Sequence, residues 1–302
     1  MRRVERERVN VEANGKVKER VIVTWNVQRL SMNENNRRRL RRVCERVERE
    51  GWEIVLLTEV KANEDGVIWM GEDDKRVAVV HSRMAGVLLR GDALRVWMRE
   101  GQRMMYGKRV VTVELGGLRL VSVYQPIWGS DDREMEEYRM DVESQVARGG
   151  KECLIVGGDF NASVGRNESR EGVCGVFGLG RANEAGRDLI EWCDEHDLVY
   201  VNSYMKHKWR GTWFHMRFAR WYELDGFVMR KNERHSMVKR MWTSEKGDLS
   251  DHRAKVMSVR VDQKKWRVDW ANVKRVPRIK WEELSKGDVR RAYQIKTTEL
   301  ME

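Results

Sequence analysis

Residues 153–163 read CLIVGGDFNAS, a short apolar run followed by two glycines and then by Asp159 and Asn161. The apolar run predicts a buried strand. Polar side chains at the end of such a strand are held by a rigid sheet, and functional groups usually lie in such places. Taken alone, GGDFN also fits a glycine-rich turn closed by an Asx hydrogen bond. The choice between the two depends on the other strands of the chain.

The same pattern, a predicted strand bordered by polar side chains, recurs at other places in the chain. TWN places Asn26 after one strand, LLTE places Glu59 after the next, and LSDH places Asp251 and His252 just before the last. Each has an ordinary explanation by itself, such as a turn or cap for Asn26 and a surface position for His252. So many polar borders in one chain are hard to obtain by chance, and we interpret them as one functional site.

Strands and helices follow one another along the chain. Amphipathic spacing predicts helices at 31–50, 131–148 and 183–196, the first with a basic outer face. Gly116 and Gly117 predict a hairpin turn. Strands are predicted at 20–26, 54–57, 77–80, 86–89, 110–114, 118–123, 153–156, 199–201, 211–215, 223–229 and 254–260. Strands with helices between them indicate an α/β protein with a sheet-rich core.

The length of 302 residues permits one large domain or two small ones. Residues 1–18 are dense in charge and predict a charged N-terminal arm. The strand pattern ends near Gln263. We therefore expect the functional domain at 19–262 and a linker or partly helical tail at 263–302.

The chain is basic, with a net charge of +11 and a pI of about 9.6. This favours a polyanionic partner, either nucleic acid or an anionic membrane, although solubility alone explains the charge as well. The sequence has neither an apolar signal segment nor an apolar run long enough to span a membrane. The four cysteines form no CxxC pair, which is typical of a reducing compartment. We expect a nuclear or cytoplasmic protein that is not secreted, with no particular protein partner indicated.

The polar residues form a chemically coherent set. Hydrolysis of a phosphodiester needs a charge clamp on the phosphoryl oxygens, an activated water and help for the leaving oxygen. A glutamate with further carboxylates or amides makes a hard-oxygen site that suits Mg²⁺. An aspartate can deprotonate water, an asparagine can donate to phosphate, and a histidine oriented by a carboxylate can hold or protonate a phosphate oxygen.

The motifs TWN, LLTE, VYQP, GGDFNA, ELDGF and LSDH occur in the order and spacing of the endonuclease/exonuclease/phosphatase superfamily, which the chain resembles over about residues 19–262. Within it, the chain most resembles endonuclease domains of non-LTR retrotransposons of the LINE and RTE types, and their craniofacial development protein 2-like relatives. The tail motif PRIKWEEL resembles the linker that follows such domains. The resemblance implies a DNase I-like, four-layer sandwich in which two packed mixed sheets are flanked by helices.

The resemblance also implies a metal site. Glu59 is expected to be the main ligand of Mg²⁺, or of Mn²⁺ in its place. Asn26 is expected beside it, and Asp251 near the same metal or near a second one.

The resemblance implies catalytic roles for five further residues. They are Tyr124 at the scissile phosphate, Asp159 at the attacking water, Asn161 at the phosphate in the transition state, and Asp225 as the partner that orients His252. On residue type alone, Tyr124 fits a packed strand-end tyrosine equally well. Ser250 and Thr212 are expected to support this group, and Trp213 to be structural or to line a DNA groove.

Two positions depart from the family pattern. Gln28 stands where many members, notably abasic-site repair enzymes, carry an aspartate, which moves the resemblance toward the retrotransposon type. Gly226 stands where members often carry a tyrosine, and it is expected to loosen the packing behind Asp225.

Three functions remain open at this point. The first is an Mg²⁺-dependent endonuclease that nicks one strand of DNA, with Trp209, Arg210 and Arg217 adding stacking and phosphate contacts; a core Trp beside solvated arginines explains that stretch equally well. The second is a phosphatase of the same fold that acts on inositol phosphates or phospholipids. The third is a catalytically silent DNA-binding relic.

Overall fold

The computed structural model describes residues 17–32, 37–72, 75–127, 129–147, 150–166 and 170–267. These residues belong to one compact unit that ends at Arg267. Most of the expected N-terminal arm, residues 1–16, and most of the expected tail, residues 268–302, lie outside the described residues.

The larger sheet consists of β1 (Val17–Ser31), β2 (Ile54–Lys61), β3 (Gly66–Met70), β4 (Val77–His81), β5 (Ala85–Arg90), β14 (Val238–Thr243) and β15 (Lys255–Asp262). The strand order is β14-β15-β1-β2-β5-β4-β3. β1 pairs in parallel with β2 and antiparallel with β15, so the sheet is mixed. Valine, isoleucine and leucine dominate β2 and residues 21–23 of β1, as expected for strands that are buried on both faces.

The smaller sheet consists of β6 (Met104–Gly107), β7 (Val110–Leu115), β8 (Leu118–Tyr124), β9 (Cys153–Asp159), β10 (Leu198–Tyr200) and β13 (Asp225–Arg230). The strand order is β10-β13-β9-β8-β7-β6, and β8 and β9 are parallel. A separate two-stranded ribbon is formed by β11 (Trp213–His215) and β12 (Arg220–Tyr222).

The two sheets pack face to face, with β1 and β2 against β8 and β9. Leu56 of β2 and Phe227 of β13 fill the space beside Gly157 of β9, where a Cβ atom would come within 2.7 Å and 2.8 Å of them. The first glycine of the GGD motif is therefore needed for close packing between the sheets, because any larger residue would push them apart.

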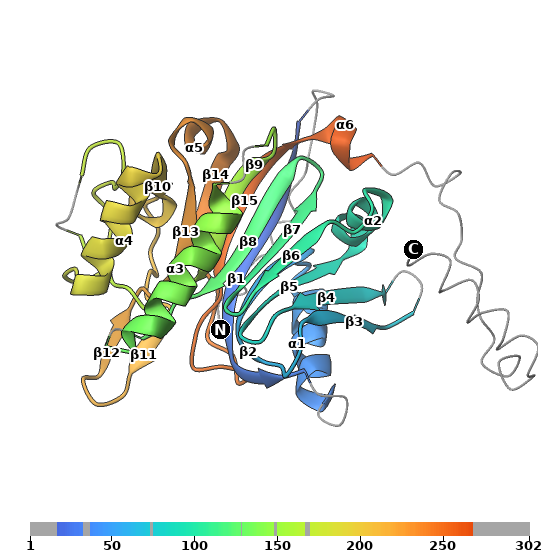
Figure 1. Ribbon diagram of the computed structural model, residues 1–302, viewed down its shortest axis with the longest axis horizontal. Helices are drawn as coiled ribbons and strands as arrows, with labels where there is room; N and C mark the ends of the chain where they lie inside the picture. The colour runs from blue at the N-terminus through green and yellow to red at the C-terminus, as the bar shows by residue number, and fades with distance from the viewer. Residues whose placement is uncertain are drawn as a thin grey trace, which may run out of the picture. The chain divides into compact units, whose positions relative to one another are not determined.

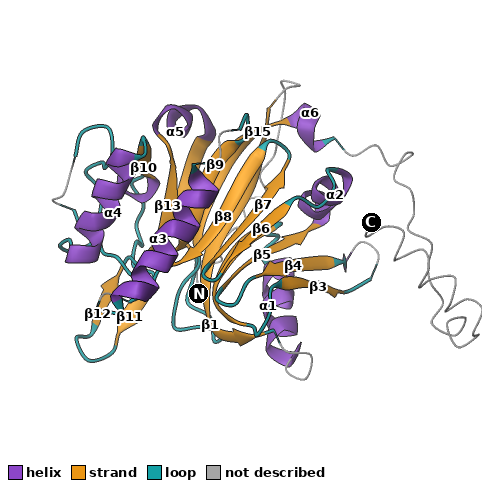
Figure 2. Cartoon of the chain, viewed as in Figure 1, coloured by secondary structure: helices purple, strands orange, loops and turns teal. Residues whose placement is uncertain are grey.

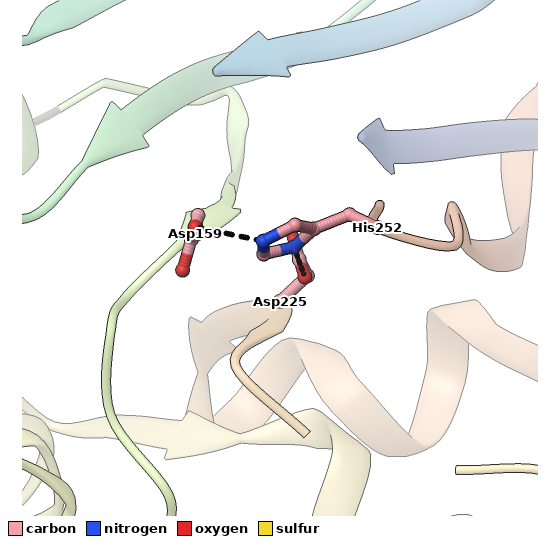
Figure 3. A group of neighbouring side chains, drawn as sticks. All are labelled: Asp159, Asp225 and His252. Carbon is pink, nitrogen blue, oxygen red and sulfur yellow. Dashed lines mark hydrogen bonds and ion pairs between the residues drawn. The ribbon is translucent and has the colours of Figure 1, made fainter. Parts of the chain in front are cut away.

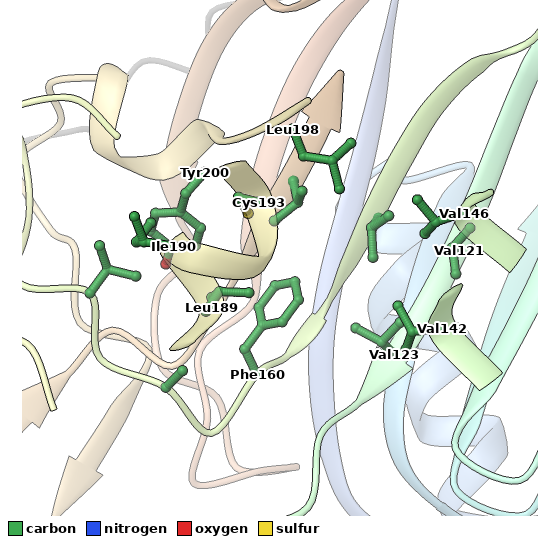
Figure 4. Packing of buried hydrophobic residues seen from close by; sticks show 14 of the residues in the cluster. Val121, Val123, Val142, Val146, Phe160, Leu189, Ile190, Cys193, Leu198 and Tyr200 are labelled. Atoms are coloured by element: carbon green, nitrogen blue, oxygen red, sulfur yellow. The ribbon is translucent and has the colours of Figure 1, made fainter. Parts of the chain in front are cut away.

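Helices cover both outer faces of the sandwich (Figures 1 and 2). The helical elements among the described residues are α1 (Arg37–Arg49), α2 (Gly91–Arg99), α3 (Asp132–Val146), α4 (Glu184–Glu195), α5 (Lys231–Met237), α6 (Gln263–Trp266) and a 3₁₀ turn at Val201–Tyr204. Leu40, Val43 and Val47 of α1 pack on the larger sheet. α3 and α4 pack on the smaller sheet, and Figure 4 shows Phe160 beneath Leu189 of α4. The expected four-layer sandwich of two mixed sheets is confirmed.

The elements differ from the sequence prediction in two ways. The first predicted helix was placed too early, because Leu30 and Ser31 continue β1 by pairing with Val60 and Lys61, and α1 begins only at Arg37. The elements β3, α2, β6, β12, α5 and β14 were not predicted. Most of them are short or at sheet edges, where the periodicity of a few residues is weak.

The described chain continues past the expected domain end at residue 262. α6 follows β15 directly, and its Trp266 is buried. The indole Nε1 donates to Gly116 O at 3.1 Å, and the guanidinium of Arg20 lies 4.6 Å from the ring centroid. These contacts join residues 263–267 to the turn between β7 and β8.

Candidate active site

Three polar residues are brought side by side by strand register in the smaller sheet. Tyr124 at the end of β8 is opposite Asp159 at the end of β9, and Asp159 is opposite Asp225 at the start of β13. In the larger sheet Asn26 of β1 is opposite Thr58, so that Glu59 follows directly. The polar side chains that the separate motifs place at strand ends thus meet at one edge of the sandwich.

Asp159, Asp225 and His252 form the centre of this group (Figure 3). The Nδ1 atom of His252 is 2.8 Å from Oδ2 of Asp225, while its Nε2 atom is 4.0 Å from Oδ2 of Asp159. The first distance is a hydrogen bond, and the second is too long for one. All three side chains are buried. Asp225 therefore orients the imidazole, and Asp159 faces its free nitrogen.

The electrostatics of this group push two pKa values above their ordinary values. Burial raises the pKa of Asp159 to about 6, and the charge of Asp225 acts in the same direction. Burial lowers the pKa of His252, but the charge of Asp225 and its hydrogen bond outweigh burial and raise it to about 9. At neutral pH Asp159 is therefore ionised and His252 is protonated.

Hydrogen bonds fix the carboxylate of Asp159 on both oxygens. Asn26 donates its amide Nδ2 to Oδ2 at 2.9 Å, and the backbone N–H of Asn161 donates to Oδ1 at 2.9 Å. Asn161 also donates its side-chain Nδ2 to Gln125 O at 2.7 Å, which leaves one amide hydrogen for a ligand. This arrangement supports a role for Asp159 as an oriented base.

Glu59 is held by Tyr124, which is opposite Asp159 in the sheet. The phenol of Tyr124 donates to Oε1 of Glu59 at 3.0 Å. Glu59 has a φ of 56° and Asn161 a φ of 46°, both in the left-handed region that non-glycine residues rarely adopt. Such strain collects at functional sites, where the surrounding structure holds it.

The loop before β15 completes the site. Ser250 donates its hydroxyl to Asn26 O at 2.7 Å and accepts from the backbone N–H of His252 at 3.0 Å. Asp251 accepts through Oδ2 from the indole of Trp213 at 3.1 Å. The indole of Trp213 thus orients Asp251, a role that residue type alone did not indicate.

Asn26, Glu59 and Asp251 line one cavity and offer oxygen atoms, the kind of ligand that a hard divalent cation prefers. Tyr124 donates to one oxygen of Glu59, and Trp213 donates to one oxygen of Asp251. The backbone N–H of Gln28 donates to Oδ1 of Asn26 at 2.8 Å. Such outer partners are typical around ligands of Mg²⁺. The cluster of Asp159, Asp225 and His252 is compact enough for a metal as well. We favour proton handling there, because His252 is protonated at neutral pH and a protonated imidazole has no lone pair to offer a metal.

A cavity of about 590 Å³ opens over these residues. Its lining includes every residue predicted for the metal site and every predicted catalytic residue except Asp225, which is covered by His252. Aromatic side chains of the ribbon, Trp213 and Tyr222, form one wall. The site is therefore an open depression that an extended substrate can enter.

Two details of the predicted site were wrong. Arg210 is not a solvated arginine, because it is 9% exposed and pairs with Glu223. Trp209 is 61% exposed, so it is not a core residue. The packing behind Asp225 is not loosened at Gly226. A Cβ there would lie 2.8 Å from Nδ2 of Asn202 and 2.9 Å from the hydroxyl of Tyr200, so these two side chains fill the space.

Sequence reasoning missed the buried polar residues that stand behind Asp225. Asn202 accepts from Phe227 N at 3.0 Å and donates to Asp225 O at 3.1 Å. Glu223 binds Asn202, Arg210 and Lys255. Glu223 in ELDGF was the signal in the sequence for these buried partners. A strand that leads into the core rarely carries an unpaired glutamate.

The comparisons with known proteins place the chain in a family. A model of the Endonuclease/Exonuclease/phosphatase family matches residues 23–252, and the chain belongs to this family. It is 31% identical over 191 residues to craniofacial development protein 2 of Bos taurus, which covers 60% of this chain and 31% of the bovine protein. It is 36% identical over 87 residues to the protein of that name from Tragulus javanicus, over 28% of this chain and 15% of that protein. The chain thus spans less than a third of these relatives.

Two solved structures resemble the fold. The AP endonuclease LMAP from Leishmania major superimposes with a TM-score of 0.52 at 15% identity, over 80% of this chain and 88% of that one. The endonuclease domain of TRAS1, a telomere-specific non-LTR retrotransposon, gives a TM-score of 0.49 at 16% identity, over 81% of this chain and 99% of that one.

Among the described residues, no helix combines the length and the apolar character needed to cross a membrane.

Proposed function

We propose that this chain is a metal-dependent endonuclease that cuts one strand of DNA. The observation that carries the proposal is the opposed pair at the centre of the site, a carboxylate 4.0 Å from an imidazolium that Asp225 fixes. With pKa values of about 6 and about 9, Asp159 can accept a proton from water while His252 offsets charge on a phosphate oxygen.

Asn26, Glu59 and Asp251 are the residues that would hold Mg²⁺. When bound, the ion supplies stabilisation of the negative charge that develops on the phosphoryl oxygens. The hydrogen bonds from Tyr124 and Trp213 keep the two carboxylates oriented for this purpose.

The positive net charge of the chain supports DNA as the substrate. The chain carries a net charge of +11. A second depression, lined by Arg39, Arg42 and Lys246 and by Asp248, which pairs with Arg42, shares Gln28, Arg39 and Asp251 with the site cavity. Phosphates of a bound strand would be attracted to these cations as it leaves the site. Derivation from a non-LTR retrotransposon rests on the sequence motifs alone.

The test is nicking of supercoiled plasmid, measured with Mg²⁺ and with EDTA. We expect metal-dependent nicking that falls by at least about 100-fold in Asp159→Asn and in His252→Asn, because each removes a group that acts in the transition state. The matched controls are Asp132→Asn and His235→Asn, which are exposed helical residues and should nick as the wild type does.

Undiminished nicking by both site variants would refute the site. Salt-sensitive DNA binding without cleavage would refute the enzyme and favour a silent DNA-binding protein. Hydrolysis of inositol phosphates or phospholipids, with DNA left intact, would refute the nuclease and favour a phosphatase.

A further inference from the structure

A cluster of buried charges lies directly behind Asp225. The catalytic pair, which is Asp159 and His252, depends on Asp225 because it orients the imidazole. Lys255 is 0% exposed, Glu223 is 4% exposed and Arg210 is 9% exposed. The ammonium Nζ of Lys255 is 2.5 Å from Oε1 of Glu223, and Nε of Arg210 is 3.0 Å from its Oε2. One glutamate therefore holds two cations, with one carboxylate oxygen on each.

The cluster stands on the same chain segments that carry the site. Its members lie two residues before Asp225, two residues before Thr212 and three residues after His252. Thr212 accepts through its hydroxyl from the backbone N–H of Asp225 at 3.1 Å, which ties the first two segments together at the level of the site. A displacement of the cluster would therefore move Asp225 and His252 relative to each other.

A second connection runs from Glu223 to Asp225 through an amide. Asn202, fully buried, donates its Nδ2 both to Oε1 of Glu223 at 3.0 Å and to the backbone carbonyl of Asp225 at 3.1 Å. The carboxylate thus reaches the Asp225 backbone through one side chain.

Stability alone is a poor reason for such a cluster. Apolar side chains of similar volume are often as stable as a buried ion pair, because taking charges out of water is costly. Burial raises the pKa of Glu223, but the charges of Lys255 and Arg210 outweigh burial and hold it below its usual range. His207, whose Nε2 lies 2.8 Å from Nζ of Lys255, has a pKa lowered to about 4 and so is neutral. The charges are therefore retained and specifically partnered.

We propose that Glu223 is a positioning residue for the catalytic pair, holding Arg210 and Lys255 so that Asp225 stays hydrogen-bonded to His252. This inference rests on the proposed function, because it assigns Glu223 a role in that same reaction. Glu223 itself lines neither the site cavity nor the predicted metal site.

The test compares Glu223→Gln with Glu114→Gln, a matched buried carboxylate. Glu114 of β7 is 8% exposed and pairs with Arg119 of β8 at 2.8 Å. Arg119 is near the start of β8, whereas Tyr124 of the site is at its end. We expect both variants to lose thermal stability, but only Glu223→Gln to lose kcat for plasmid nicking, by about tenfold or more with KM unchanged. In metal-free protein, the downfield NMR signal of the His252 Nδ1 proton should weaken only in Glu223→Gln.

A double variant separates positioning from folding. Glu223→Gln with Lys255→Met restores the net charge of the cluster, so thermal stability should recover while kcat stays low. The proposal is overturned if kcat and the Nδ1 proton signal of Glu223→Gln match those of Glu114→Gln, or if kcat recovers in the double variant. Should wild type fail to nick, the proposed function fails, and the NMR signal in metal-free protein still decides the positioning role.

Discussion

His252 shows at the scale of one residue how partner charges reverse the effect of burial. Alone in an apolar setting, an imidazole would lose its proton, because burial penalises its charged form. Asp225 on one side and Asp159 on the other reverse this and bring the pKa to about 9. The protonated ring is therefore part of the folded structure at neutral pH, before any substrate binds.

This has a consequence for stability against pH. The pKa of His252 is raised in the folded state from 6.5 to about 9, so its contribution is fully present below pH 6.5 and is lost as the pH rises through 9. We expect the free energy of unfolding of metal-free protein to fall by about 3 kcal/mol over this range because of this group. Denaturant unfolding in EDTA measures it.

The control for this prediction is the exposed His235. The fall attributed to His252 should be absent in His252→Asn and retained in His235→Asn. A wild-type profile that runs parallel to that of His252→Asn would contradict the assigned pKa. The pH dependence of both proteins would then come from other groups.

At the scale of one element, the start of β13 is shaped by what packs behind it. Gly226 has no side chain, and Asn202 and Tyr200 occupy that space. The family pattern at this one position predicts a loss of packing, because members often carry a tyrosine where this chain has Gly226. The replacement side chains come from a segment more than 20 residues away, which no local pattern could reveal.

We expect Gly226→Ala to destabilise the protein by about 1–3 kcal/mol and to reduce nicking, because its Cβ would collide with the amide that holds Asp225. The control is Gly66→Ala in β3, where the nearest atom to a Cβ is 3.8 Å away, in His81. Thermal unfolding of the two variants measures the difference. Equal stability would show that the Asn202 contact yields easily.

At the scale of the whole molecule, the compact unit extends to α6. Trp266 is 4% exposed and packs on Arg20 and Gly116, which are far away in the sequence. We propose that the functional domain ends near Arg267. The sequence placed its end near residue 262 because the strand pattern stops there, and a single buried tryptophan in a basic segment gives no periodic signal.

Trp266→Ala should lower the free energy of unfolding by about 3 kcal/mol, since it leaves a large cavity between α6 and the hairpin. Trp209→Ala serves as the control, because that side chain is 61% exposed and should change stability by no more than about 0.5 kcal/mol. Urea unfolding at neutral pH compares them. If Trp266→Ala lowers the free energy of unfolding by no more than Trp209→Ala does, α6 adds nothing to the stability of the fold.

The charge of the whole molecule predicts salt-dependent DNA binding. Each phosphate contact releases counterions, so binding of duplex DNA by Asp159→Asn should weaken by at least about tenfold between about 50 and about 200 mM salt. Fluorescence anisotropy measures this. An affinity that does not change with salt would argue against DNA phosphates as the ligand of the basic surface.

The sequence by itself determined most of the strands and the polar side chains at their ends, and the resemblance to a family implied the layers of the fold. Apolar runs such as 153–156 and 54–57 specify strands wherever they are placed, because burial is encoded locally in side-chain type. The tertiary structure decided which borders meet, since register across β8, β9 and β13 places Tyr124, Asp159 and Asp225 side by side.

Only the tertiary structure could show the partners that set the chemistry. The raised pKa of His252, the burial of Arg210 and the contacts of Glu223 depend on residues distant in sequence. Charge and desolvation act through space over a few ångströms, whereas sequence patterns record neighbours along the chain. Residue types and motifs therefore predicted which residues form the candidate site. The packing of the two sheets determined their orientation and the protonation states of Asp159 and His252.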